Sequence, residues 1–302
     1  MKRLGRRLFW GGSVISGGYW VFRYLRPQHS TLMLNDQVVI ITGASMGIGR
    51  ALAFAFARRG ARMVLVARNA ERLEAVRREI EPYTADVLVL AADITVDEQL
   101  EQVVQRTLDT FGRVDVVVNN AGQTLGGWLY EQDAQKIAQL IDVNLKAAIR
   151  LTQLVLPHML KQHHGFIMNV ASEAGRTATP LYSAYVASKY GLAGFTDALR
   201  REVDGTGLYL TLVLPSWTQT DMIPTALIDL LERRGFRIYT PDEVAERAIL
   251  GLVHGENEVI IGDWMVRLGI WVERYAPILL RLYWRLAMTP EWIAAVNRVG
   301  RE

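Results

Sequence analysis

From residue 37 onward, short apolar runs alternate with longer amphipathic stretches, and this alternation restricts the possible folds more than any other feature. The apolar runs are predicted as strands at 38–42, 62–67, 87–91, 114–118, 166–170, 209–214 and 258–261. Helical patterns lie between them, near 47–59, 69–81, 96–111, 132–161, 182–203 and 241–253. Several runs are apolar throughout, as strands buried on both faces are. The sequence therefore predicts an α/β fold, a Rossmann-like doubly wound parallel sheet of about seven strands with helices on both faces.

Residues 35–262 are interpreted as one domain, because no repeat, low-complexity tract or linker divides them. Apolar residues make up 50% of the chain and charged residues 22%, as in a folded globular protein. Cysteine is absent, which excludes disulfides and thiolate metal sites, and no metal site is predicted.

The first segment, 1–34, is basic and apolar. Six of the 34 basic residues lie within residues 1–30, which contain no acid, so the rest of the chain holds 28 basic and 31 acidic residues. Nucleic-acid binding by the main domain is therefore not expected. Between Arg7 and Arg23 lie fifteen residues without a formal charge, with aromatic rings near both ends.

This uncharged stretch is shorter than the about 20 residues that a membrane-spanning helix needs. We expect a short transmembrane or interfacial anchor. A cleaved signal peptide and an apolar arm packed on the protein or on a second subunit are the alternatives. A cofactor site of cytosolic type downstream favours a catalytic domain that faces the cytoplasm, although cations at both ends of the stretch leave its orientation open.

The last segment, 263–302, combines cations with aromatic residues. Arg267, Arg274 and Arg281 recur every seven residues, and Arg285 follows one turn later. On helices this spacing places a cationic stripe opposite aromatic and aliphatic residues, and Pro277 is expected to kink or divide the segment. The pattern predicts amphipathic helices that either lie on a membrane or pack in a dimer with their arginines in solvent.

A glycine-rich turn follows the first predicted strand and opens a helix. It reads Gly43-Ala44-Ser45-Met46-Gly47-Ile48-Gly49. Glycines here permit a tight turn and allow the backbone to approach a pyrophosphate at the positive end of the helix. The spacing predicts dinucleotide binding by Gly43, Ser45, Met46, Gly47, Ile48 and Gly49.

Further cofactor residues are expected after the next strands, at the same edge of the sheet. Arg68 stands where an acid would bind the 2′-hydroxyl of NAD, and its guanidinium suits a 2′-phosphate. This position therefore favours NADP(H) over NAD(H). The alternative is that Arg68 is only the first solvated residue of a loop. Asp93 either meets the adenine edge or caps the next turn. The turn Asn120-Ala121-Gly122 supplies an amide and small residues beside the cofactor.

Tyr185 and Lys189 are four residues apart in a predicted helix and therefore share one face. A lysine charge beside the phenol is expected to lower the pKa of Tyr185 toward the range of a general acid or base. Alone, the pair also fits a solvated helix face. Together with Ser172, thirteen residues upstream, and the glycine turn, it predicts an oxidoreductase.

The order and spacing of these motifs resemble the short-chain dehydrogenase/reductase family over about residues 36–262. The resemblance rests on Thr42-Gly43-x-x-x-Gly47-x-Gly49, Asn119-Asn120-Ala121-Gly122, Asn144, Ser172 and Tyr185-x-x-x-Lys189. It implies an enzyme with one Rossmann-like domain, usually a homodimer or tetramer, that transfers hydride between a nicotinamide and a carbonyl or alcohol. With Arg68, an NADP-dependent carbonyl reductase or alcohol dehydrogenase is expected.

The resemblance also implies the catalytic roles. Tyr185 is the general acid in carbonyl reduction or the base in alcohol oxidation, and Ser172 hydrogen-bonds the substrate oxygen. Lys189 lowers the tyrosine pKa and contacts the nicotinamide ribose. Asn144 holds a water of the proton relay or, alternatively, stabilises a helix bend. The remaining cofactor contacts that it implies are Ile94, Pro215, Thr218 and Thr220.

One departure from the family pattern follows the sixth strand, where Ser216 replaces the glycine of a Pro-Gly pair and Trp217 adds bulk near the nicotinamide. The family implies a substrate lid near 216–240. The apolar run 222–231 within it indicates an apolar substrate, although ordinary core packing explains the same pattern.

The apolar lid and termini predict a hydrophobic, lipid-like substrate that is reached at a membrane surface. The stretch 66–69 and the apolar tails look similar to 3-ketosphinganine reductases and to 11β-hydroxysteroid-type enzymes, which suggests a long-chain 3-keto compound or a steroid-like ketone. The alternatives are a soluble reductase of small polar ketones, whose termini serve oligomerisation, and a cofactor-binding scaffold without turnover.

Overall fold

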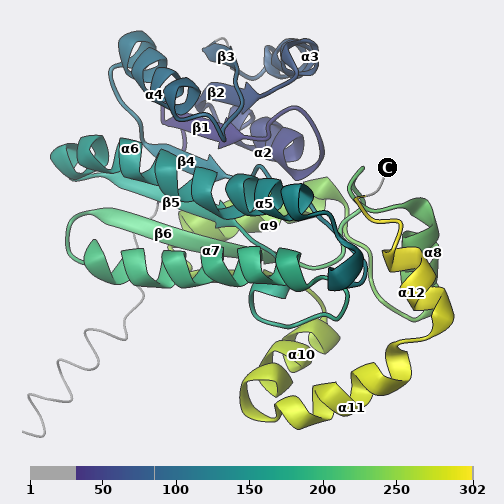
Figure 1. Cartoon of the computed structure of the whole chain (residues 1–302). Helices are drawn as coiled ribbons and strands as arrows, with labels where there is room; N and C mark the ends of the chain where they lie inside the picture. Colours follow the sequence, from purple (N-terminus) through teal and green to yellow (C-terminus); the bar gives the residue numbers. More distant parts are fainter. Residues whose placement is uncertain (1–31, 85, 301–302) are drawn as a thin grey trace, which may run out of the picture.

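The computed structural model describes residues 32–84 and 86–300, so the predicted anchor at 1–34 lies almost wholly outside the described residues. Within them, one parallel sheet has the strand order β3-β2-β1-β4-β5-β6-β7 (Figure 1). The predicted fold is therefore confirmed. The strands are β1 (Val38–Thr42), β2 (Arg62–Ala67), β3 (Val87–Ala91), β4 (Val116–Asn119), β5 (Gly165–Val170), β6 (Leu208–Pro215) and β7 (Glu258–Ile261).

Helices cover both faces of the sheet because both faces of its central strands are apolar. One core layer joins the strands to α2 (Gly47–Ala57), α3 (Ala70–Ile80) and α9 (Pro241–Val253). The other joins them to α4 (Asp97–Phe111), α6 (Ala147–Gln162) and α7 (Ser183–Glu202), which lie on the near side in Figure 1. The order of β1 beside both β2 and β4 reverses the direction of winding at β1 and opens a crevice at the carboxyl ends of these strands.

The fourth strand and the long helix after it are two of the predicted elements whose boundaries differ from the structure. β4 begins two residues later than predicted. Asp115, just before it, still bonds to both neighbouring strands through its backbone, and its buried carboxylate accepts the amide of Val38 at 2.9 Å and pairs with Arg113 at 2.6 Å. The long helix predicted at 132–161 is divided into α5 (Ala134–Ile141), a π-helical turn at Asp142–Lys146, and α6.

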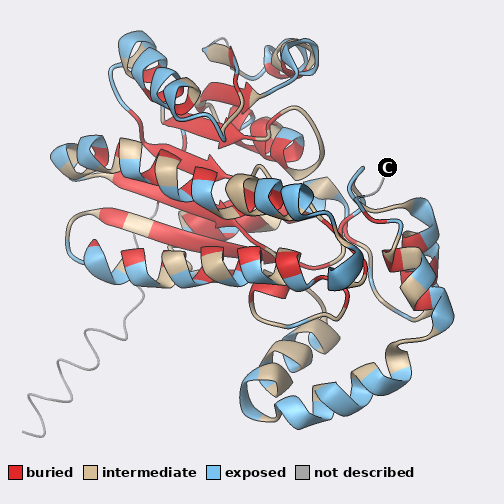
Figure 2. Cartoon of the chain, viewed as in Figure 1, coloured by how far each residue is buried: buried red, intermediate tan, exposed pale blue. Residues whose placement is uncertain are grey.

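The segment after β7 forms α10 (Trp264–Tyr275), α11 (Pro277–Ala287) and α12 (Pro290–Val296). Pro277 begins a new helix, so the predicted division is confirmed. Neither α10 nor α11 has a buried residue, and both project from the body in Figure 2. Among the described helices, none combines the length and apolar content that crossing a bilayer requires.

α12 differs from the two helices before it because it packs into the body. Trp292 is only 2% exposed, and it clusters with Leu227 and Leu231 of α8 (Thr225–Arg233), the helix within the predicted lid. Two arginines at the end of α8 hold α12 and the turn before it, and Arg233 pairs with Glu291 of α12 at 2.7 Å. Arg234 donates to the Ala287 carbonyl oxygen at 3.1 Å and to Thr289 Oγ1 at 2.7 Å.

Candidate active site

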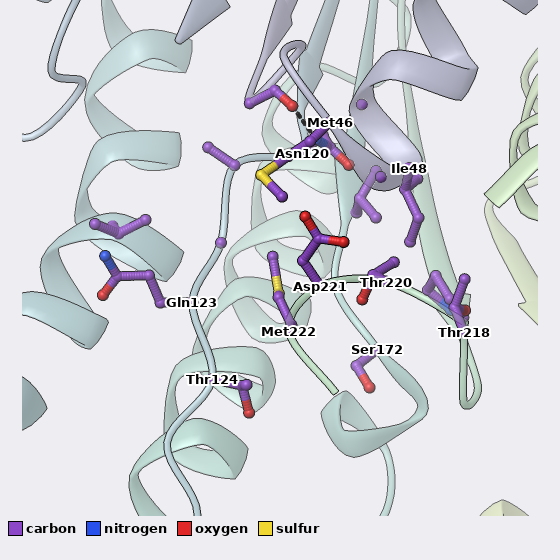
Figure 3. Close-up of a pocket in the computed structure, with 18 of the residues that line it drawn as sticks. Met46, Ile48, Asn120, Gln123, Thr124, Ser172, Thr218, Thr220, Asp221 and Met222 are labelled. Atoms are coloured by element: carbon purple, nitrogen blue, oxygen red, sulfur yellow. Dashed lines mark hydrogen bonds between the residues drawn. The ribbon is translucent and has the colours of Figure 1, made fainter. Parts of the chain in front are cut away.

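A cavity of about 650 Å³ lies at the carboxyl edge of the sheet, where the crevice is expected. Its wall contains Ser172, Tyr185, Lys189 and every cofactor residue predicted from the sequence. These cofactor residues are Gly43, Ser45, Met46, Gly47, Ile48, Gly49, Arg68, Asp93, Ile94, Asn120, Ala121, Gly122, Tyr185, Lys189, Pro215, Thr218 and Thr220. In Figure 3, Met46 and Ile48 approach the cavity from the glycine turn, while Thr220, Asp221 and Met222 approach it from the segment after β6.

The glycine turn is fixed against the loop that follows β4. Gly43 has a φ of 66°, and a Cβ there would lie 2.9 Å from the Cα of Ala121. Asn120 Nδ2 donates to the Thr42 carbonyl oxygen at 2.9 Å, and Thr42 Oγ1 accepts the amide of Asn120 at 3.0 Å. These bonds hold the two loops at a fixed separation, and only glycine allows so close an approach at position 43.

The same wall fits a dinucleotide. Gly47 also has a positive φ, and a Cβ there would point toward Thr220, 3.4 Å away, so its absence keeps the space between the turn and the β6 loop open. The turn leads directly into α2, which begins at the cavity, and the first backbone amides of a helix have no hydrogen-bond partner within that helix. A pyrophosphate group is an anion of the kind that such a helix start attracts.

Two guanidinium groups lie at the end of the cavity beyond β2. Arg68 was predicted, and its charge helps to lower the pKa of Asp93, after the larger effect of the hydrogen bonds from Thr95. Asp93 accepts the Thr95 amide at 2.9 Å while it lines the cavity, so its capping role and its place in the site coexist. Arg72 is a site residue that the sequence analysis missed, and its guanidinium approaches Met46 Sδ at 3.6 Å. The available signal was its position four residues after Arg68, one turn into the next helix.

At the opposite end, Ser172 and Tyr185 are joined by a side-chain hydrogen bond. Ser172 follows β5 and caps a short helical turn by accepting the amide of Ala174 at 3.1 Å. Tyr185 lies on α7, one turn before Lys189, whose Nζ donates to the Val170 carbonyl oxygen at 3.1 Å and lies 5.8 Å from the Tyr185 ring centroid. The structure thus brings together Ser172, Tyr185 and Lys189, as the sequence motif predicts.

One expectation about this group is wrong for the arrangement that the structure shows. Burial raises the pKa of Tyr185 to about 12, and the hydrogen bond with Ser172 lowers it only in part. Burial also lowers the pKa of Lys189 to about 8. The predicted lowering of the tyrosine pKa by lysine is not observed because the ammonium is directed at Val170 and both groups are desolvated.

Asn144 is the one predicted catalytic residue that does not line this cavity. It is 1% exposed and lies within the π-helical turn between α5 and α6. Its side chain accepts the amide of Gln123 at 2.7 Å and donates to Ser188 Oγ at 3.0 Å, and Ser188 in turn donates to the Tyr185 carbonyl oxygen at 2.7 Å. These bonds match the predicted stabilisation of a helix bend and join that bend to the catalytic helix.

Glu173 is a second residue that the sequence analysis missed. It follows Ser172 and lines the cavity, and burial raises its pKa to about 7. A hydrogen bond with Ser216 opposes this shift, and the charge of Asp263 adds to it. The negative charge of Glu173 also contributes to the raised pKa of Tyr185. No motif identified this residue, because its environment comes from β6 and from the start of α10.

The remaining wall is aromatic and apolar. Tyr182 lies 6.1 Å from Tyr185 and 6.4 Å from Trp217, measured between ring centroids. Trp217, the bulky departure from the family pattern, in turn meets Trp292 of α12 at 6.4 Å. Val299 from the end of the described chain also lines the cavity. The wall beside the catalytic tyrosine is therefore built partly by residues beyond the predicted domain boundary at 262.

Comparison with known proteins agrees with the fold and the motifs. Residues 37–228 match the family described as short chain dehydrogenase. Dehydrogenase/reductase SDR family member 7 from Mus musculus is 33% identical over 256 residues, which cover 81% of this chain and 75% of the relative. The 3-oxoacyl-[acyl-carrier-protein] reductase FabG from Thermotoga maritima is 33% identical over 237 residues, 77% of this chain and 96% of the relative. Ketoacyl reductase HetN from Nostoc sp. is 34% identical over 231 residues, 76% and 80% respectively.

The fold and the site define an oxidoreductase of the kind that uses a nicotinamide cofactor. The chain belongs to the short-chain dehydrogenase family.

Proposed function

We propose that the protein is an NADP(H)-dependent carbonyl reductase that acts on a hydrophobic, lipid-like ketone. The observation that carries this proposal is the half-buried, hydrogen-bonded pair of Ser172 and Tyr185, with Lys189 beside it, in the wall of a cavity that begins at a dinucleotide-type glycine turn. Carbonyl reduction needs three groups from the protein close to the carbonyl oxygen: an acid, a hydrogen-bond donor and a cation.

When bound, the nicotinamide supplies the hydride. Tyr185 is protonated at neutral pH because burial raises its pKa to about 12, so its phenol can donate a proton to the carbonyl oxygen as negative charge develops there. Ser172 donates a hydrogen bond to the same oxygen and holds it near the phenol. In this mechanism the ammonium of Lys189 turns from the Val170 carbonyl oxygen toward the phenolate that forms on Tyr185 and stabilises it.

NADP(H) is favoured by two guanidinium groups, those of Arg68 and Arg72, at the end of the cavity beyond β2. A 2′-phosphate would receive charge-assisted hydrogen bonds from both, since arginine matches phosphate geometry. The nearby carboxylate of Asp93 accepts hydrogen bonds from the amide and the hydroxyl of Thr95, and no ion pair between it and either arginine is formed among the described residues. Because cells hold NADPH mainly as a reductant, reduction is the proposed direction.

The substrate is assigned from the apolar half of the cavity. Tyr182, Trp217, Met222 and Ile223 line it near Tyr185, and they offer a ketone few polar partners. The names of two relatives, a ketoacyl reductase and a 3-oxoacyl reductase, support a long-chain 3-keto compound. A steroid-like ketone is the second member of the same hydrophobic class.

The proposal is tested with purified protein in detergent micelles, NADPH, and three ketones: a long-chain 3-keto ester, a steroid ketone and a small polar ketone. We expect NADPH oxidation with at least one hydrophobic ketone and much slower oxidation of NADH. Tyr185→Phe should lower kcat by about 10²–10⁴, the range of a lost general acid. Tyr182→Phe is the matched control, since the Tyr182 ring lies 6.1 Å from that of Tyr185. It should retain activity, because the Tyr182 hydroxyl has no role in the proposed proton transfer.

Three outcomes would contradict the proposal in different ways. Full activity of Tyr185→Phe would remove the proton-transfer role. Turnover of the small polar ketone alone would favour a soluble reductase of such ketones. NADPH binding without turnover of any ketone would favour a cofactor-binding scaffold.

A further inference from the structure

α10 and α11 present a continuous apolar face to solvent. Trp264, Leu268, Trp271 and Tyr275 follow one another at helical spacing along α10, and their exposed fractions are 70%, 48%, 56% and 62%. The pattern continues on α11, where the exposed members are Ile278, Leu279, Leu282, Tyr283 and Leu286. Single exposed apolar residues are common on soluble proteins, but a contiguous set of this size marks an interaction surface. We call these nine residues the apolar face.

Arginines border the apolar face. Arg267 and Arg274 on α10, and Arg281 and Arg285 on α11, are exposed, and none of them forms a salt bridge with another described residue. Glu273 is the one acid within residues 264–287, so this segment carries a net charge of +3. Long arginine side chains beside an apolar stripe can reach lipid phosphates while the stripe enters the acyl boundary.

The two helices are too short to cross a bilayer, because α10 has 12 residues and α11 has 11, against the about 20 that a span requires. They also pack mainly on each other, so that both can lie in one plane below the body of the protein (Figure 1). Tryptophan and tyrosine rings, which occupy both helices, favour the boundary between headgroups and acyl chains.

A chain of aromatic rings leads from these helices to the catalytic tyrosine. Trp284 of α11 lies 5.8 Å from Trp292, which meets Trp217, and Trp217 meets Tyr182 beside Tyr185. The same cluster contains Leu227, Leu230 and Leu231 of α8 in the predicted lid. The outer helices and the wall of the cavity are thus parts of one apolar structure.

We propose that the apolar face rests on an anionic lipid bilayer and that the hydrophobic ketone passes from this bilayer along the aromatic chain to Tyr185. The second part rests on the function proposed above, whereas docking itself does not. A second copy of the chain is a weaker candidate for this face, since a symmetric contact would bring two segments of charge +3 together.

Docking is tested in the full chain with a fluorescent label at a single position of the apolar face. The label reports on this face alone, even if residues 1–31 also bind the vesicles. The chain has no cysteine, so Leu282→Cys carries a single environment-sensitive fluorophore. Phosphatidylcholine vesicles with phosphatidylglycerol should shift its emission to the blue. Leu250→Cys on α9 is the matched control, because Leu250 is exposed to a similar extent, 44% against 49%, and its emission should not change.

The charge component has its own matched pair. Arg274→Gln with Arg281→Gln should weaken vesicle binding at the labelled position about tenfold or more, since each surface arginine contributes substantially near anionic lipid. Arg106→Gln with Arg201→Gln removes two exposed charges from α4 and α7 and should leave binding unchanged. Equal binding to vesicles of phosphatidylcholine alone would overturn the anionic preference.

Other outcomes would overturn docking itself. No emission change at position 282 while the protein sediments with vesicles would assign binding to the segment outside the described residues. A blue-shifted emission without lipid, together with a doubled mass, would assign the face to a second copy. If the label enters the bilayer but NADPH reduces no ketone, docking stands and the proposed function fails. If soluble and vesicle-borne ketones are reduced equally by the Arg274→Gln, Arg281→Gln variant, the delivery route fails alone.

Discussion

At the scale of single residues, burial shifts the proton affinities of Tyr185 and Lys189 in opposite directions. The phenol holds its proton more tightly, with a pKa of about 12, and the ammonium holds its proton less tightly, with a pKa of about 8. Desolvation penalises whichever form is charged, so the two shifts have one cause. The pair therefore combines a fully protonated acid with a cation that is lost within an accessible pH range.

This arrangement predicts the pH dependence of ketone reduction at saturating NADPH. Between pH of about 7, above which Glu173 is largely ionised, and pH of about 8, Lys189 is charged and can stabilise the phenolate that forms on Tyr185, so kcat/KM should be nearly constant. Above that pH, Lys189 becomes neutral while Tyr185 remains protonated, so kcat/KM should fall by about tenfold per pH unit.

The control for this prediction is Lys189→Met, which has no ammonium to lose. Its kcat/KM should be low throughout and should lack the falling limb near pH 8. A wild-type profile that stays flat to pH 10 would show that the charge of Lys189 is not needed for the proton transfer.

The site residues that the sequence identified are those whose chemistry is tied to a motif, and Ser172 and Arg68 are examples. Their surroundings could not be predicted in the same way. The pKa shift of Tyr185 has the opposite sign to the one expected, because spacing along a helix shows that two side chains are near but not how deeply they are buried. Glu173 and Arg72 carried no motif, and only the fold places them on the cavity wall.

At the scale of elements, the predicted strands were accurate wherever the apolar run and the ladder coincide, as in β1, β2, β3 and β7. The start of α9 was also predictable, since Thr240 and Glu243 form the capping box that their spacing suggests. The π-helical turn around Asn144 was not predicted. Its extra residue per turn depends on bonds from Asn144 to Gln123 and Ser188, which are distant in the sequence.

The glycine turn gives a prediction with an internal control. A Cβ at Gly49 would clash with the carbonyl oxygen of Gly43 and with Asn120 Nδ2, both of which are held by neighbouring bonds. Gly49→Ala should therefore weaken NADPH binding at least tenfold and lower the free energy of unfolding by about 1–3 kcal/mol.

The matched change is Gly194→Ala on α7, where nothing lies within 4 Å of the added Cβ. It should raise the free energy of unfolding by about 0.5–1 kcal/mol, because alanine restricts the unfolded chain and favours the helix. Cofactor titration and denaturant unfolding of both variants measure the difference. Equal NADPH affinity in the two variants would mean that the turn does not hold the cofactor.

At the scale of the whole molecule, the sequence divides the chain at residue 262, whereas the structure continues the catalytic body beyond that point. α12 fills the space beside α8, and Val299 reaches the cavity wall. Sequence patterns could not show this because α12 is short and its apolar residues resemble those of the two exposed helices before it. Within residues 263–302, the exposed α10 and α11 and the buried α12 are therefore expected to contribute very differently to stability.

Two tryptophans test that difference with the same substitution. Trp292 is 2% exposed in contact with α8, while Trp264 is 70% exposed on α10. Trp292→Ala should lower the free energy of unfolding by about 3–5 kcal/mol, because it leaves a large cavity between α12 and the lid. Trp264→Ala should change it by less than about 0.5 kcal/mol in the absence of lipid. Both values come from denaturant unfolding, and similar losses in the two variants would show that α10 is as much a part of the folded core as α12.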